Sequence, residues 1–378
     1  MKKLLFLLIL LCIPYGVFAE ELIPNAVSGI LIEPISGKII YEKDKDKQVS
    51  VASMTKMVSQ IIILEEIEKG KIKWDDVVTV SSNASSMGGS QIYLEDGEKM
   101  SVRDLMKGIS VASGNDATVA MAEYISGSEE KFVKRMNKKV KELGLKNTHF
   151  VNSTGLDEKD HYSSAYDMAM IAKELVLNHS EVLEFSSIYE DYLRQDSDNK
   201  FWLVNTNKLI SQYEGTDGLK TGHTDDAGYC LAATVKRNNL RLIGIVLGES
   251  DSKVRNKETI DLLDYGFNSI KSKILKKKGT IIEKISLNKA SKKKINLVLK
   301  DDLSVVENVD DDNNYSYDIK LNDIDIPIKK GDILGKIQVK LKDKVITTGD
   351  LISNNNVDKV SFIELFKNNI INVITGNI

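Results

Sequence analysis

Residues 217–247 read DGLKTGHTDDAGYCLAATVKRNNLRLIGIVL, and this stretch decides the fold class. It contains three short apolar segments, at 219–221, 229–235 and 240–247, separated by turn residues such as Asn238 and Asn239. Short apolar runs bounded by turn residues are typical of neighbouring β-strands. The stretch therefore predicts three strands of one sheet.

The residues before this stretch add a hairpin and a group of helices. Apolar residues flank the turn sequence ISGK at 35–38, which predicts a β-hairpin over 29–41. Apolar positions recur at helical spacing over 54–67 and 165–176, and a helix over 101–109 begins with a serine cap. Strands at both ends with helices between them predict an α+β layer architecture.

The residues after the third strand predict a second, all-β domain. A helix ends near Phe267, and we interpret the lysine-rich stretch 271–278 as a linker. Beyond it, β-type runs at 295–299, 317–321 and 337–341 are separated by Asp, Asn and Gly clusters.

The end of the chain, 357–374, predicts an amphipathic helix. Its apolar side chains recur at helical spacing, at Phe362, Ile363, Phe366, Ile370, Val373 and Ile374. Such a helix can lie in a membrane interface or pack on its own domain. Three asparagines and a single nearby lysine, Lys367, weaken electrostatic attachment to lipid, so the pattern leaves both interpretations open.

The start of the chain has the pattern of a secretory signal. Lys2 and Lys3 precede the apolar run 4–13, and Ala19 has the small side chain of a cleavage site. This run is shorter than the ~20 residues that span a bilayer as a helical anchor. We expect cleavage after Ala19 and an extracytoplasmic protein, peripheral on the outer face of the cytoplasmic membrane if the tail binds lipid.

Composition excludes several kinds of partner. The net charge of −3 carries no basic excess, so nucleic acid is not expected. Because Cys12 lies in the leader, Cys230 would remain alone and no internal disulfide could form. With four scattered histidines and no second cysteine, we expect neither a metal site nor another cofactor.

Three short elements predict the chemistry. Ser53 and Lys56 are three residues apart at a helix start, which places a nucleophile and a base in contact range. Ser113 and Asn115 form a Ser-x-Asn element at the end of another predicted helix. Lys220, in the only Lys-Thr-Gly of the chain, lies on the first predicted strand. The first two elements recur by chance elsewhere, so only the combination in this order is specific.

With these elements the sequence resembles the low-molecular-mass penicillin-binding proteins, the D-alanyl-D-alanine carboxypeptidases. The three motifs of that family are matched by ASMTKM at 52–57, ASGNDA at 112–117 and DGLKTGHT at 217–224. Other stretches similar to family sequence are 88–90, 150–156 and 161–168. One departure is Val51, which stands where proline is frequent.

The resemblance implies the domain organisation. A β-lactamase/transpeptidase-like domain, an antiparallel sheet with a helical cluster, would occupy 20–270 after a signal peptide over 1–19. A small β-sandwich domain would follow over 271–356, and an amphipathic tail over 357–378.

The resemblance also implies a serine peptidase that removes the terminal D-alanine from peptidoglycan stem peptides ending in D-Ala-D-Ala, and that β-lactam antibiotics acylate. Ser53 would be the nucleophile and Lys56 the proton acceptor, held neutral by burial and by the charge of Lys220. Ser113 would relay a proton to the departing D-alanine. Backbone N–H groups of Ser53 and His223 would bind the oxyanion.

The remaining implied residues would bind substrate. Asn115 would hold the substrate amide, and Lys220 with Thr221 would attract the terminal carboxylate. Arg255 would add a second cation, although it also fits an ordinary surface arginine. Gly222 would let the substrate backbone approach the strand edge.

Two other functions fit part of the pattern. A β-lactamase shares the acylation machinery, but Gly114 within Ser-Gly-Asn and a separate β-domain favour the carboxypeptidase. A non-catalytic wall-binding or drug-sensing module would be expected to have lost a motif residue, and none is missing.

Overall fold

The computed structural model describes residues 21–288 and 290–360. Its first sheet contains five antiparallel strands in the order β2-β1-β9-β8-β7. Their bounds are β1 Ser28–Glu33, β2 Lys38–Lys43, β7 Thr216–Thr224, β8 Gly228–Arg237 and β9 Leu240–Glu249. The predicted hairpin and the three predicted strands are therefore confirmed as one sheet.

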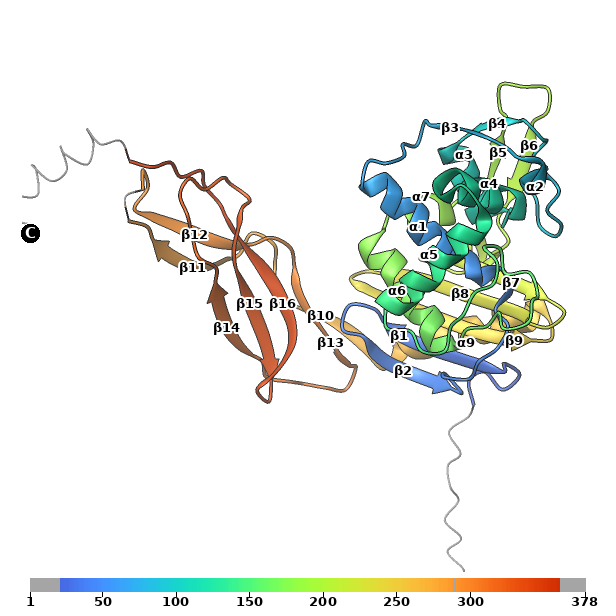
Figure 1. Cartoon of the computed structure of the whole chain (residues 1–378). Coiled ribbons are helices and arrows are strands. Elements are labelled where there is room, and N and C mark those ends of the chain that lie inside the picture. The colour runs from blue at the N-terminus through green and yellow to red at the C-terminus, as the bar shows by residue number, and fades with distance from the viewer. Residues whose placement is uncertain (1–20, 289, 361–378) are drawn as a thin grey trace, which may run out of the picture.

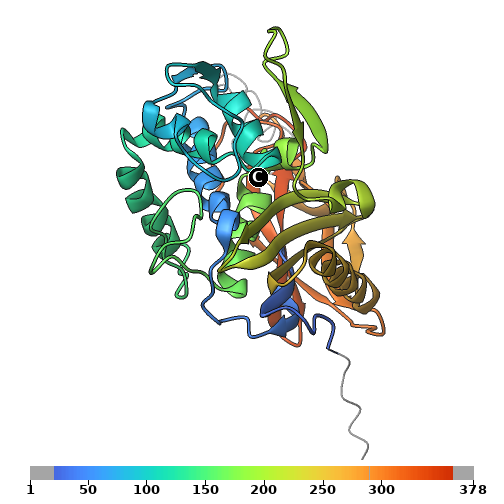
Figure 2. The same cartoon turned by 90° about the vertical axis from the view of Figure 1, so that its right-hand side faces the viewer.

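Side chains alternate between two cores on opposite faces of this sheet. In β1, Ile30 and Ile32 enter the larger core, whereas Leu31 enters the smaller one with Leu262 and Leu263 of α9 (Ser252–Ser269). This alternation is the period-2 pattern of a strand with both faces covered. Figure 2 shows α9 on one side of the sheet and the helical cluster on the other.

The helical cluster lies between β2 and β7 in the chain. It contains η1 Ala52–Thr55, α1 Lys56–Glu68, α2 Ser82–Ser85, α3 Val102–Val111, α4 Asn115–Ser126, α5 Glu129–Glu142, α6 Ala165–Asn178, α7 Val182–Ser186 and α8 Leu209–Gln212. The predicted cap is present, because Ser101 Oγ accepts the N–H of Asp104. Two short hairpins accompany the helices, β3 Val77–Thr79 with β4 Lys99–Ser101 and β5 Glu190–Leu193 with β6 Phe201–Val204.

The chain after α9 forms an all-β region that extends away from the first sheet and the helical cluster (Figure 1). A sheet in the order β11-β12-β16-β15-β14 comprises β11 Ile281–Ser286, β12 Lys294–Leu299, β14 Ser316–Leu321, β15 Ile333–Leu341 and β16 Lys344–Ser353. The all-β prediction is confirmed, with more strands than the three predicted runs.

The interpretation of 271–278 as a linker is wrong. β10 (Ile270–Lys276) pairs with β13 (Leu303–Asn308) in a two-stranded sheet. Two of its lysines, Lys271 and Lys273, lie 3.5 and 3.6 Å from the buried carboxylate of Glu307. Lysines that have such a partner do not prevent a strand.

The predicted tail helix does not begin at 357. Val357 is buried in the core of the all-β region and forms a β-bridge with Ile328. The rest of the predicted helix, 361–374, and the leader lie outside the described residues. Within 21–288 and 290–360, none of the helices has the length and apolar character to cross a membrane.

Candidate active site

Ser53 lies in the turn of 3-10 helix that leads into α1, and Lys56 is the first residue of α1. Lys56 Nζ donates to Ser53 Oγ at 2.8 Å and to the carbonyl oxygen of Thr154 at 2.7 Å. The Lys56 side chain is fully buried. The predicted contact between Ser53 and Lys56 is therefore present, with Thr154 as a second anchor for the amine.

A second buried lysine, Lys220, affects the charge state of Lys56. Burial, and then the charge of Lys220, hold the pKa of Lys56 well below its usual value, while Asp116 opposes the shift. Burial, and then the charge of Arg255, lower the pKa of Lys220 to about 7. The arrangement favours a neutral amine at Lys56, which is the form that can accept a proton.

Ser113 and Asn115 lie where α3 ends and α4 begins. Ser113 has a φ of +63°, in the left-handed region, and its buried Oγ has no hydrogen-bond partner in the described part of the chain. Asn115 Nδ2 donates to the carbonyl oxygen of Gly88 at 2.7 Å, which leaves its buried Oδ1 without a donor among the described residues. Both oxygens thus keep an unused hydrogen-bonding capacity in the interior of the site.

Strand β7 forms the edge of the first sheet beside Ser53. Lys220 Nζ donates to the carbonyl oxygen of Thr221 at 3.0 Å, and Thr221 Oγ1 donates to Thr206 Oγ1 at 2.7 Å. A Cβ at Gly222 would lie 2.6 Å from the carbonyl oxygen of Val51. Gly222 thus leaves room for the turn that carries Ser53, and the approach of substrate backbone to Gly222 stays a prediction.

A cleft of about 460 Å³ connects these elements. Its lining includes Ser53, Ser90, Ser113, Thr206, Thr221, Gly222, His223, Tyr229, Arg255 and Asn256. Lys56, Asn115 and Lys220 are not part of the lining, although each bonds to a residue of the cleft wall: Ser53, Ser90 and Thr221 respectively.

Arg255 and His223 face this cleft in different ways. Arg255 is 5% exposed and donates to Asn256 Oδ1 at 2.8 and 3.1 Å, so it is not an ordinary surface arginine. Burial lowers its pKa. His223 is exposed, and its ring lies against that of Tyr229 with centroids 4.0 Å apart.

Two loops to which the sequence motifs assign no role bond to the residues of the site. The loop containing Thr154 is tied to the Ser53 turn, because His161 Nε2 bonds Thr55 Oγ1 at 2.8 Å and His161 Nδ1 accepts the N–H of Val151. Burial, and then His149, lower the pKa of His161 to about 4. The second loop, 88–98, bonds to Asn115. Both contain stretches similar to family sequence, which was the available signal.

Comparison with known proteins assigns the chain to a family. A family model described as D-alanyl-D-alanine carboxypeptidase matches residues 19–251. The chain belongs to this family. A model of the penicillin-binding protein 5 C-terminal domain matches residues 271–359. Family membership and the expected enzyme class, a serine-type D-alanyl-D-alanine carboxypeptidase, are thereby confirmed.

Individual members of the family support the assignment along most of the chain. The chain is 47% identical to D-alanyl-D-alanine carboxypeptidase DacF of Bacillus subtilis, over 93% of this chain and 91% of the relative. It is similar to penicillin-binding protein 5 of Haemophilus influenzae at 32% identity and a TM-score of 0.68, over 89% of this chain and 98% of that one. Penicillin-binding protein D2 of Listeria monocytogenes, solved in an ampicillin-bound form, covers 64% of this chain and 98% of its own at 32% identity and a TM-score of 0.59.

Proposed function

We propose that this carboxypeptidase removes the terminal D-alanine of peptidoglycan pentapeptides through an ester formed on Ser53. The observation that carries the proposal is the 2.8 Å contact between Ser53 Oγ and the amine of the fully buried Lys56. A serine hydroxyl becomes a good nucleophile only when a neighbouring base takes its proton. Lys56, with its lowered pKa, is that base.

Acylation begins when Lys56 Nζ accepts the Ser53 proton and Ser53 Oγ bonds to the carbonyl carbon of the penultimate D-alanine. The carbonyl oxygen becomes an oxyanion, which backbone N–H groups of Ser53 and His223 stabilise. The unpartnered hydroxyl of Ser113 relays the proton from Lys56 to the nitrogen of the terminal D-alanine as the C–N bond breaks, which leaves Lys56 neutral again. Water then hydrolyses the ester and frees Ser53.

Substrate recognition uses the remaining polar groups. The free Oδ1 of Asn115 accepts an amide N–H of the peptide. Lys220, Thr221 and Arg255 supply the positive charge and hydrogen bonds that attract the terminal carboxylate. All three lie on or next to the cleft, which supports this assignment.

The same ester explains penicillin binding. A β-lactam presents a strained amide carbonyl, and attack by Ser53 Oγ opens the ring and leaves the drug attached. The ampicillin-bound Listeria relative supports this extension to the present chain.

The test is mass spectrometry of the protein after reaction with a fluorescent penicillin, combined with release of D-alanine from a pentapeptide mimic. We expect one adduct, on Ser53, and loss of both signals in Ser53→Ala by a factor of at least about 10⁴. Ser82→Ala, at an exposed serine of α2, is the control and should keep both. An adduct that persists in Ser53→Ala would assign the nucleophile elsewhere.

We further propose that the enzyme acts outside the cytoplasm, after cleavage at Ala19, and that its C-terminal residues attach it to the membrane surface. The leader pattern and the apolar stripe of the tail support this. Deletion of 361–378 keeps Val357 in its core position. It should move the protein to the soluble fraction with kcat/KM unchanged, and unchanged fractionation would contradict the anchor.

A further inference from the structure

The loop 88–98, between α2 and β4, forms a wall of the cleft and holds Asn115. Ser90 lines the cleft, and its carbonyl oxygen accepts the backbone N–H of Asn115 at 2.7 Å. The carbonyl oxygen of Gly88 accepts Asn115 Nδ2. The position of this loop therefore sets the direction in which Asn115 Oδ1 points.

The middle of this loop is strained and is held on one side by Asp116. Tyr93 has a φ of +56°, a left-handed conformation that a bulky residue keeps only when its surroundings enforce it. The N–H groups of Ile92 and Leu94, on either side of it, donate to the carboxylate of Asp116 at 3.0 to 3.1 Å. Asp116 directly follows Asn115.

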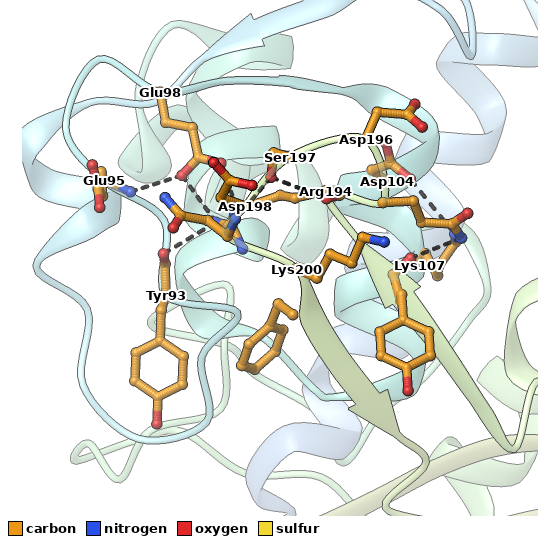
Figure 3. Close-up of a pocket in the computed structure, with 14 residues that line it drawn as sticks. Tyr93, Glu95, Glu98, Asp104, Lys107, Arg194, Asp196, Ser197, Asp198 and Lys200 are labelled. Atoms are coloured by element: carbon orange, nitrogen blue, oxygen red, sulfur yellow. Dashed lines mark hydrogen bonds and ion pairs between the residues drawn. The ribbon is translucent and has the colours of Figure 1, made fainter.

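Arg194 also bonds to this loop, and Figure 3 shows it with Tyr93 and Glu98. Its guanidinium donates to the carbonyl oxygens of Ile92 and Tyr93, each at 3.1 Å. It also makes a two-point contact with Glu98, at 2.7 and 2.9 Å. The two side chains are only 16% and 19% exposed, so solvent screens this pair less than a surface pair.

The hairpin β5–β6 brings Arg194 to the loop and also leads the chain to another part of the cleft lining. Arg194 follows β5 directly. At the other end of the hairpin, β6 leads into Thr206, which lines the cleft and accepts a hydrogen bond from Thr221 of β7. The segment from Arg194 to Thr206 thus contacts both the loop 88–98 and strand β7.

We propose that Arg194 is a positioning residue for the carboxypeptidase reaction. It clamps residues 92–94 against Asp116 and thereby fixes the Ser90 wall and the amide of Asn115 in the orientation that receives substrate. The inference rests on the proposed role of Asn115. It gives a function to a residue outside the three motifs.

The test compares Arg194→Ala with Arg135→Ala in the full chain. Arg135 donates to Glu66 at 2.6 Å between α5 and α1, so it offers a part-buried arginine–glutamate pair that does not line the cleft. In Arg194→Ala we expect about a tenfold rise in the KM for a pentapeptide mimic, with a smaller change in kcat. Amide hydrogen exchange at 92, 94 and 115 should quicken. The control should lose thermal stability without either change.

A conservative variant and a second site make the test decisive. Arg194→Lys keeps the charge but cannot contact Glu98 and two carbonyls at once, so it should recover only part of the affinity. Glu98→Gln keeps the shape and should raise KM about threefold, which provides the readout if Arg194→Ala does not fold. Unchanged KM and exchange in a folded variant would overturn the inference. In that case penicillin labelling of wild-type Ser53 would leave the proposed function standing.

Discussion

Strand β7 at an edge of the first five-stranded sheet and strand β14 at an edge of the second differ in their surroundings. Most of β7 is buried, and the turn carrying Ser53 lies against it at Gly222. Every residue of β14 is exposed, including Tyr317, Ile319 and Leu321. Both edges present backbone groups to which another strand could pair.

The difference shows how an edge can be used or protected. In β7 the turn that carries Ser53 lies against the edge and the cleft borders it, so under the proposed function a peptide that pairs with this edge lies beside Ser53. In β14 charged residues alternate with the apolar ones, and Asp318 pairs with Lys340 of β15. Charges on an exposed edge oppose pairing with another chain.

The largest expected effect comes from adding one methyl group beside each edge. In Gly222→Ala the Cβ would lie 2.6 Å from the Val51 carbonyl oxygen, and in Gly335→Ala 2.6 Å from that of Lys320 in β14. We expect Gly222→Ala to lower kcat/KM at least about a hundredfold, because the Ser53 turn must move. Gly335→Ala should cost about 1–3 kcal/mol of stability with kcat/KM unchanged. Equal losses of activity would remove the distinction between the edges.

An intermediate effect is expected in the pH profile. In the proposed mechanism Lys56 must be neutral and Lys220 charged, so kcat/KM should fall at low pH as Lys56 gains a proton. It should fall again as pH rises through about 7, where Lys220 loses its charge. Lys220→Arg keeps the charge and should remove the alkaline limb, even if its peak activity is lower. Lys320→Gln, on exposed β14, should leave the profile as it is, and an alkaline limb that survives in Lys220→Arg would reassign it.

The smallest expected effect is a difference in the free energy of unfolding between variants of two ion pairs, one on β7 and one on β14. Asp217 of β7 makes a two-point contact with Arg241 at 2.7 Å, and the arginine also bonds Thr234. Arg241→Ala should lower the free energy of unfolding by about 1.5–3 kcal/mol. Lys340→Ala, at the more exposed pair on β14, should change it by less than about 1 kcal/mol. Urea denaturation monitored for each variant would show whether the order is reversed.

Much of this comparison could be predicted from local sequence. Short apolar runs bounded by turn residues predict β7, β8 and β9, and the three-residue spacing of Ser53 and Lys56 predicts their contact. These features depend on residues close together in the sequence, whose relative positions the backbone geometry largely determines.

The features that were missed depend on contacts distant in sequence. The lysines of β10 favour a linker by composition, but they pair with the carboxylate of Glu307, which lets this segment form a strand. Nothing near Thr154 indicates that its carbonyl oxygen meets the Lys56 amine, 98 positions away. The clamp by Arg194 likewise joins segments 96 to 102 positions apart. Such contacts exist only after the helical cluster and the sheet have packed together.

The thiol of Cys230 lies in β8 directly opposite Gly222, fully buried, and burial raises its pKa to about 11. In the native protein a maleimide or iodoacetamide reagent therefore meets neither an accessible sulfur nor a thiolate. Alkylation requires the strand beside the nucleophile to separate from its neighbours. The rate of alkylation thus measures how often the sheet beside Ser53 opens, at a cysteine that the natural sequence already supplies.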